Sequence, residues 1–162
     1  MLWYLLNIKH LINYLRVKGT LDMAYPPFIL ASTAAALGWE VQIFFTFYGL
    51  QLLRNSLDDI KISPLANPAM PMPVPMPVLV QILPGMESMA TMMMKNKMKS
   101  KGVASLQELR DLCLEADVKF VACQMTVDLF EFQTSEFIKD VEYGGAATFM
   151  KFAGESDVCL FI

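Results

Sequence analysis

The chain has 162 residues, of which 55% are hydrophobic and 18% charged, and its net charge is -3 at pH 7. This length suits one domain, so we predict a single domain over residues 1–162, and the charge lacks the basic stripe that nucleic-acid binding requires. A mean hydropathy of +0.42 is high for a solitary domain and indicates that a subunit interface or a membrane covers apolar surface.

The first half of the chain predicts a strand, a helix and a second strand. The opening residues 1–17 are apolar but contain Lys9, His10 and Arg16, which makes them a poor signal peptide and compatible with a short amphipathic helix. Residues 13–47 then follow the order strand, glycine turn, alanine-rich helix, stop at Gly38 and second strand, Val41 to Phe47. The second strand is apolar almost throughout, as strands of a parallel sheet are when both faces are covered.

Residues 23–53 are apolar enough to suggest a membrane span, but prolines, a glycine and a glutamate divide them. The pieces are shorter than the roughly 20 residues that a spanning helix needs. We therefore expect a buried helix followed by a buried strand.

The second half predicts more alternation of helices and strands. A short helix is expected near residues 50–57, a methionine-rich helix with a basic end before Gly102, and another helix whose capping box is Ser105 with Glu108. KFVACQMT predicts a third strand, VEYGGAATFMKFAG a strand, turn and helix, and DVCLFI a last strand. The expected fold class is therefore α/β, a Rossmann-like open and mainly parallel sheet of about five strands with helices on both faces.

Three cysteines are the main candidates for chemistry, and their odd number without a CxxC motif argues against a disulfide framework or a zinc site. Cys123 ends the third strand and precedes Gln124 and Thr126, which open a short helix. Helix amides favour a thiolate, so Cys123 is a candidate nucleophile or sulfur carrier, although a small buried hydrophobe is the alternative. Cys113, in mid-helix, and Cys159, inside the last strand, are expected in the core, and a reducing compartment fits all three.

Two glycine turns should reach the same edge of the sheet as Cys123, because ligands of open α/β sheets bind beyond the carboxyl ends of the strands. Gly19, Gly144 and Gly145 would let the backbone approach a ligand closely. Neither turn has the G-x-G-x-x-G spacing, so a nicotinamide site is not expected. The alternative is that these glycines serve turn geometry alone.

A proline- and methionine-rich loop, residues 64–78, contains NPAMPMPVPMP. Thioethers of Met70, Met72 and Met76 are ligands that Cu(I) prefers, which makes a copper-binding module one alternative. No histidine or cysteine is interleaved with them, so we favour an extended lid over Cys123 or an adaptable interface. A membrane-associated interaction protein that uses this segment and residues 1–14 is a second alternative.

In their order, KGTLDMAYPPFILASTAAALGWEVQIFFTFYGL, NPAMPMPVPMP, GMESMATMMM, GVASLQEL, ACQMTVDLF and GGAATFMKFA resemble the DsrE/DsrF-like sulfur-relay family, specifically its second DsrE-type branch. The resemblance covers residues 18–162, and residues 1–17 depart from the family pattern of a clean apolar strand. It implies a Rossmann-like fold, a homo-oligomer, and a cytoplasmic persulfide relay with TusA-like and rhodanese-like proteins. Members are often labelled peroxiredoxin-like, but Phe120, where a T-x-x-C motif would have threonine, opposes that label.

The resemblance places the family's cysteine at Cys123. We therefore expect a persulfide carrier, or a sulfurtransferase component that acts as a carrier, without cofactor or metal. Asp22, Thr46, Gly144 and Gly145 are expected to shape the pocket, together with Gly19, Gln124 and Thr126. We expect the protein to be cytoplasmic. Peripheral membrane association is expected if the protein is instead the membrane-associated interaction protein described above.

Overall fold

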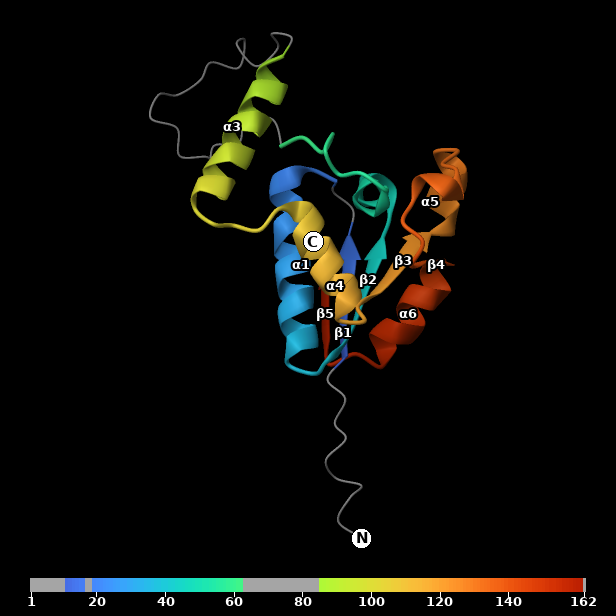
Figure 1. The fold of residues 1–162 in the computed structure, drawn as a ribbon. Helices are drawn as coiled ribbons and strands as arrows, with labels where there is room; N and C mark the ends of the chain where they lie inside the picture. Colours follow the sequence, from blue (N-terminus) through green and yellow to red (C-terminus); the bar gives the residue numbers. More distant parts are fainter. Residues whose placement is uncertain (1–10, 17–18, 63–84, 162) are drawn as a thin grey trace.

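The computed structural model describes residues 11–16, 19–62 and 85–161, which form a parallel β-sheet with flanking helices (Figure 1). The sheet has five strands in the order β4-β3-β2-β1-β5, and each strand is parallel to its neighbours. The strands are β1 (Leu11–Arg16), β2 (Glu40–Phe45), β3 (Lys119–Cys123), β4 (Val141–Gly144) and β5 (Val158–Phe161). The predicted Rossmann-like α/β class is confirmed.

Helices connect the strands and cover both faces of the sheet (Figure 1). Helix α1 (Leu21–Ala36) joins β1 to β2 and packs beside α4 (Leu106–Glu115), while α6 (Ala146–Gly154) crosses the opposite face from β4 to β5. The 3-10 helix η1 (Phe47–Leu53) and α3 (Met86–Ser100) also lie between β2 and β3; α5 (Gln124–Leu129) and the 3-10 helix η2 (Thr134–Glu136) lie between β3 and β4. Helix α3 extends away from the sheet.

The side chains of β2 alternate between two cores. Ile43 and Phe45 face α1, and the ring centroids of Phe28 and Phe45 are 6.3 Å apart. Phe44 points to the other face, where its ring lies 5.5 Å from that of Phe149 in α6. The prediction that this strand is buried on both faces is confirmed, and the second core is the one that contains Cys123.

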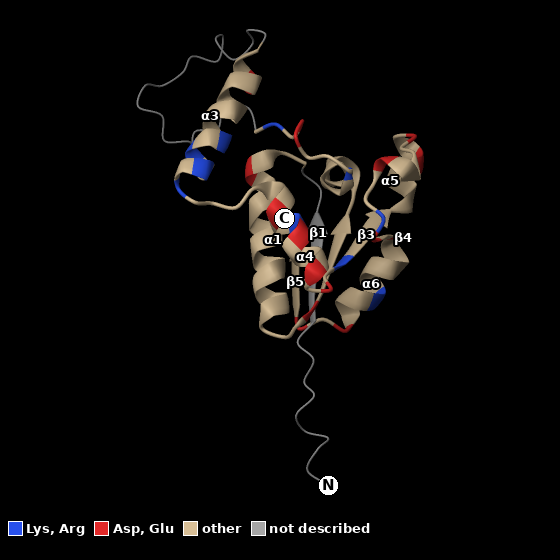
Figure 2. Ribbon diagram, viewed as in Figure 1, with Lys and Arg blue, Asp and Glu red and all other residues tan. Residues whose placement is uncertain are grey.

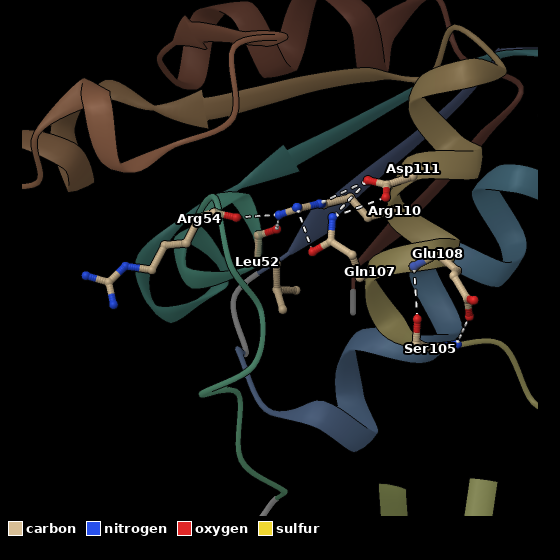
Figure 3. A network of polar contacts seen from close by, with 7 residues as sticks. All are labelled: Leu52, Arg54, Ser105, Gln107, Glu108, Arg110 and Asp111. Atoms are coloured by element: carbon tan, nitrogen blue, oxygen red, sulfur yellow. Dashed lines mark hydrogen bonds and ion pairs between the residues drawn. The ribbon is translucent and has the colours of Figure 1, made fainter. Parts of the chain in front are cut away.

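Local signals in the sequence fix the ends of several helices. The Ser105 hydroxyl accepts a hydrogen bond from the Glu108 amide at 3.2 Å, and the Ser105 amide donates to the Glu108 carboxylate at 2.6 Å (Figure 3). This is the predicted capping box, and these bonds also lower the pKa of Glu108. Helix α1 stops where Gly38 takes a φ of 82°, a conformation that glycine adopts without strain.

Two predicted boundaries differ from the structure. The second strand ends at Phe45 and not at Phe47, because Phe47 has a φ of 46° and begins η1. The short helix predicted near residues 50–57 is therefore this earlier 3-10 helix. Within the divergent segment 1–17, Leu11–Arg16 forms β1, which pairs with both β2 and β5.

The proposed lid or copper site of residues 64–78, with Met70, Met72 and Met76, lies outside the described residues, as does His10. The short amphipathic helix considered for residues 1–17 is wrong for Leu11–Arg16, which forms β1, and residues 1–10 are outside the described part of the chain. In the described part of the chain, none of the helices combines the length and the apolar character needed to cross a membrane.

Candidate functional site

Cys123 is the last residue of β3 and directly precedes α5, so it lies at the carboxyl edge of the sheet as predicted. Its residue exposure is 6%, and it belongs to the small core of Phe44 and Val121 against which Phe149 packs. So little exposed surface means that the residue is sheltered from most of the solvent. The site is therefore a sheltered thiol rather than an open cleft.

Two threonines lie beside the thiol. Thr46 follows β2, the neighbour of β3, and Thr126 is in the first turn of α5. Their hydroxyl oxygens are 3.0 Å apart, and the Phe47 amide donates to the Thr126 hydroxyl at 3.4 Å. Both side chains are buried, so the pair is held in place by the ends of two adjacent strands.

Burial and hydrogen bonding act in opposite directions on the pKa of Cys123. Burial, the largest single influence, raises it, whereas hydrogen bonds from the side chain and amide of Thr126, the hydroxyl of Thr46 and the amide of Met125 lower it. Together the hydrogen bonds prevail, and the pKa lies below that of an ordinary cysteine. Because the thiolate is the nucleophilic form, Cys123 is better prepared for sulfur chemistry at neutral pH than an unperturbed thiol.

The other two cysteines differ from Cys123 and from each other. Cys113 is fully buried, its thiol donates to the Phe28 carbonyl at 3.4 Å, and burial raises its pKa to about 12. The prediction that Cys113 belongs to the core is confirmed. The same prediction for Cys159 is wrong: this residue is exposed, because β5 is an edge strand with a neighbour on one side only.

Some of the predicted site residues lie near Cys123 in the fold. Gly144 of β4 lies opposite Cys123 in the β3–β4 register, and Gly145 follows it as the N-cap of α6. Gln124 is exposed, and its side chain donates to the Asp128 carboxylate at 2.7 Å. Thr46, Thr126 and Gly144 are therefore the predicted residues closest to the thiol by position in the fold.

Gly19 and Asp22 are farther along the same edge, after β1, which β2 separates from β3. A Cβ atom on Gly19 would come within 2.1 Å of the Tyr48 carbonyl oxygen, so only glycine fits this approach to η1. Gly19, Thr20, Tyr48 and Lys61 line a hollow of about 420 Å³ there. The membership of Gly19 and Asp22 in the Cys123 pocket remains a prediction.

Sequence reasoning missed the aromatic surroundings of the site. Phe47 and Tyr48 of η1 lie with Phe130, which follows α5: the ring centroids of Phe47 and Phe130 are 6.5 Å apart, and those of Tyr48 and Phe130 are 6.0 Å apart and stacked. The signal was a pair of aromatic runs, FTFYG at the end of β2 and LFEF at the end of the short helix that follows β3. Parallel strands bring such runs to one edge.

The substitution Thr126→Val is expected to raise the pKa of Cys123, because valine keeps the volume but removes the hydroxyl that stabilises the thiolate. The midpoint of the pH dependence of alkylation should therefore move upward in the variant, and the rate of alkylation at pH 7 should fall several-fold. Thr33→Val is the control, since its hydroxyl donates to the Ile29 carbonyl on the exposed side of α1. If the midpoint is unchanged in Thr126→Val, the threonine hydroxyls do not stabilise the Cys123 thiolate.

Comparisons with known proteins show the family and the fold of the chain. A model of the DsrE/DsrF/DrsH-like family matches residues 9–161. The chain is 66% identical over 149 residues to the sulfur carrier protein DsrE2 of Allochromatium vinosum, covering 90% of this chain and 93% of that protein. It is 36% identical over 149 residues to the uncharacterized protein YrkE of Bacillus subtilis, covering 90% and 92%. The crystal structure of the YchN protein from E. coli has the same fold, with a TM-score of 0.53 at 10% identity over 96% of this chain and all of that one.

Proposed function

This chain belongs to the DsrE/DsrF/DrsH-like family, and we propose that it is a sulfur carrier in a relay, in which Cys123 accepts sulfur as a persulfide and passes it on. The observation that carries this proposal is the Cys123 thiol, sheltered at the carboxyl edge of the sheet with hydrogen bonds that lower its pKa. The name of the Allochromatium vinosum relative, a sulfur carrier protein, supports the same role.

The transfer step needs no oxidant or reductant. The Cys123 thiolate attacks the terminal sulfur of a donor persulfide, R–S–SH, and a new S–S bond forms at Cys123 while the S–S bond of the donor breaks. The donor leaves as its thiolate, R–S⁻, with the electron pair, so Cys123 becomes a persulfide. Delivery is the same exchange in reverse with an acceptor thiolate. Hydrogen bonds that stabilise the Cys123 thiolate favour both steps, because the thiolate is the attacking group during loading and the leaving group during delivery.

A carrier that exchanges sulfur with other proteins fits the chain better than a self-contained sulfurtransferase. Residues 124–138 contain no lysine or arginine, so a thiosulfate dianion would lack a cationic partner next to the thiol in sequence. Cys113 is buried in the core and Cys159 lies on β5, which is separated from β3 by β1 and β2. We therefore propose transfer between proteins, with TusA-like and rhodanese-like carriers of the cytoplasm as partners.

Self-association is a further part of the proposal. Met150 of α6, which crosses the second face of the sheet, and Phe161 of the edge strand β5 are exposed apolar side chains. Exposed apolar surface of this kind is typical of subunit interfaces. We expect a homo-oligomer that covers α6 and β5, and the high mean hydropathy of +0.42 is consistent with it.

The test is mass spectrometry of reduced protein after anaerobic exposure to polysulfide. We expect a gain of one sulfur atom on the peptide that contains Cys123, reversed by reductant, while Cys113 stays unmodified because it is buried and its pKa is raised. Labelling that ignores Cys123, or that is equal on all three cysteines, would contradict the proposal.

A further inference from the structure

The carboxyl edge beside Cys123 exposes a group of apolar side chains that the chemistry of the thiol does not use. We call this group the apolar rim; its members are exposed by between 37% and 64%, and they are Phe47, Tyr48, Met125, Leu129 and Phe130. Phe130 contacts both aromatic residues of η1, and Met125 and Leu129 are four residues apart on α5, so they share a helix face. Aromatic residues and methionine are enriched in the centres of protein interfaces.

The backbone of the rim is strained at two positions. Phe47 has a φ of 46° and Glu131 has a φ of 56°, a left-handed conformation that is costly for bulky side chains. Phe47 directly follows Thr46, and Glu131 directly follows Phe130. Strain of this kind persists where surrounding structure enforces it, and it clusters at functional sites. Here one of the two residues, Phe47, contacts Phe130, and the other, Glu131, directly follows Phe130.

The segment that carries α5 and Phe130 has charges of one sign only, whereas on the η1 side Lys61, which is paired with Glu87 at 2.9 Å, lines a hollow with Tyr48. Residues 124–136 contain Asp128, Glu131 and Glu136 and no lysine or arginine. Glu136 is paired with Arg54 at 2.7 Å, and Asp128 accepts from the neutral side chain of Gln124. Asp128 and Glu131 therefore contribute an acidic border, which Figure 2 shows over α5.

We propose that the apolar rim and its acidic border are the docking surface for the sulfur donor or acceptor, and that the occupant is a protein segment that carries its reactive cysteine among apolar and basic residues. Apolar contact would hold that cysteine over the sheltered thiol, and lysine or arginine would meet Asp128 and Glu131. The exposed residues of α6 and β5 lie on other elements, which leaves the rim free for a different partner. This inference rests on the proposed function, because it concerns the partner that exchanges sulfur with Cys123.

The test uses persulfidated peptides with a central cysteine flanked by leucine and lysine, by leucine and glutamate, or by serine and lysine. We measure the second-order rate of sulfur transfer to Cys123 of the full chain. At low ionic strength the leucine–lysine peptide should react at least about tenfold faster than the leucine–glutamate peptide, with a smaller difference in high salt. The serine–lysine peptide should also be slower, because it lacks apolar contact.

Two variants separate the parts of the surface. The double substitution Asp128→Lys with Glu131→Lys should reverse the order of the lysine and glutamate peptides. Leu129→Ser should slow both leucine peptides roughly tenfold, by loss of apolar contact. Each rate is divided by the rate at which the same variant is loaded from the persulfide of N-acetylcysteine amide, a small donor that has no charged flanking residues and needs no docking, so that any change in the reactivity of the thiol itself is removed from the comparison. Equal rates for the three peptides, or an order that the charge reversal leaves unchanged, would overturn the proposal.

Two further outcomes have separate meanings. If the persulfide of N-acetylcysteine amide fails to load Cys123 in the parent chain, the proposed function fails, and this inference fails with it. If sedimentation velocity shows that Leu129→Ser lowers the oligomeric mass, a second copy of the chain covers the rim, and the docking proposal is overturned while the carrier function stands.

Discussion

Replacing Cys123 with serine is expected to abolish sulfur loading, with a fall of at least about a thousandfold in the rate of persulfide formation. A serine hydroxyl near the same position is not ionised at neutral pH, and it cannot form a persulfide. The hydrogen bonds that now lower the pKa of Cys123 would have no thiolate to stabilise. The rate is measured anaerobically with polysulfide and with a persulfidated protein donor, and both should fall together.

The matched control is Cys159→Ser, which removes an exposed thiol from β5 and should leave loading within about twofold of the parent, as surface substitutions usually leave structure intact. The Cys123→Ser variant should also unfold at nearly the parent temperature, because the exchange of sulfur for oxygen leaves the neighbouring core of Phe44 and Val121 in place. Sulfur that persists on Cys159 in the Cys123→Ser variant would mean that the exposed cysteine is the carrier.

The fold was predictable because the strongest sequence signals are local. The apolar β2 run, the capping box of Ser105 and Glu108, and the glycine stop at Gly38 each act within a few residues. The order of strands and helices then implied a parallel sheet. Cys123 could be placed at the carboxyl edge for the same reason, since β3 ends with it.

The errors have two causes: contacts between segments distant in sequence, and one local backbone conformation that the sequence does not indicate. Cys159 lies in a strand of apolar residues, and a strand pattern alone does not reveal that β5 is at the edge of the sheet. The start of η1 was missed because its left-handed residue is Phe47, whereas a left-handed backbone is usually indicated in a sequence by glycine. The contact between Thr46 and Thr126 joins residues 80 positions apart, so their pairing needed the sheet.

Arg110 is the clearest feature that sequence analysis passed over. It lies in the middle of α4 and is 1% exposed, although a charged residue in an amphipathic helix usually faces water. Its guanidinium donates to the carbonyls of Leu52 and Arg54 and, at 2.9 Å, to the side chain of Gln107 (Figure 3). Burial lowers the pKa of Arg110, and the nearby charge of Asp111 opposes that effect. The side chain therefore ties α4 to the end of η1.

The substitution Arg110→Ala is expected to cost about 3–5 kcal/mol of unfolding free energy, because it leaves two backbone carbonyls without their donor and opens a cavity. For a chain of this size the melting temperature should fall by roughly 10 °C. The control is Arg54→Ala, which breaks a half-exposed ion pair with Glu136 and a cation–π contact with Phe132 at 5.5 Å, and it should cost much less than the loss of the buried guanidinium. Thermal and urea unfolding of both variants give the comparison.

Loss of Arg110 should also raise the pKa of Cys123, because η1 begins directly after Thr46, whose hydroxyl lowers that pKa. A loosened η1 weakens the contact of Thr46 with Thr126, so the alkylation midpoint of Cys123 should rise in Arg110→Ala even at temperatures where the variant is folded. Arg110→Lys, which keeps one charged donor, should recover part of the stability and part of the midpoint. Equal losses of stability in Arg110→Ala and Arg54→Ala would mean that the buried guanidinium contributes no more to stability than the half-exposed one. A loss of stability without any change in the alkylation midpoint of Cys123 would mean that Arg110 stabilises the packing of α4 but does not affect the thiol.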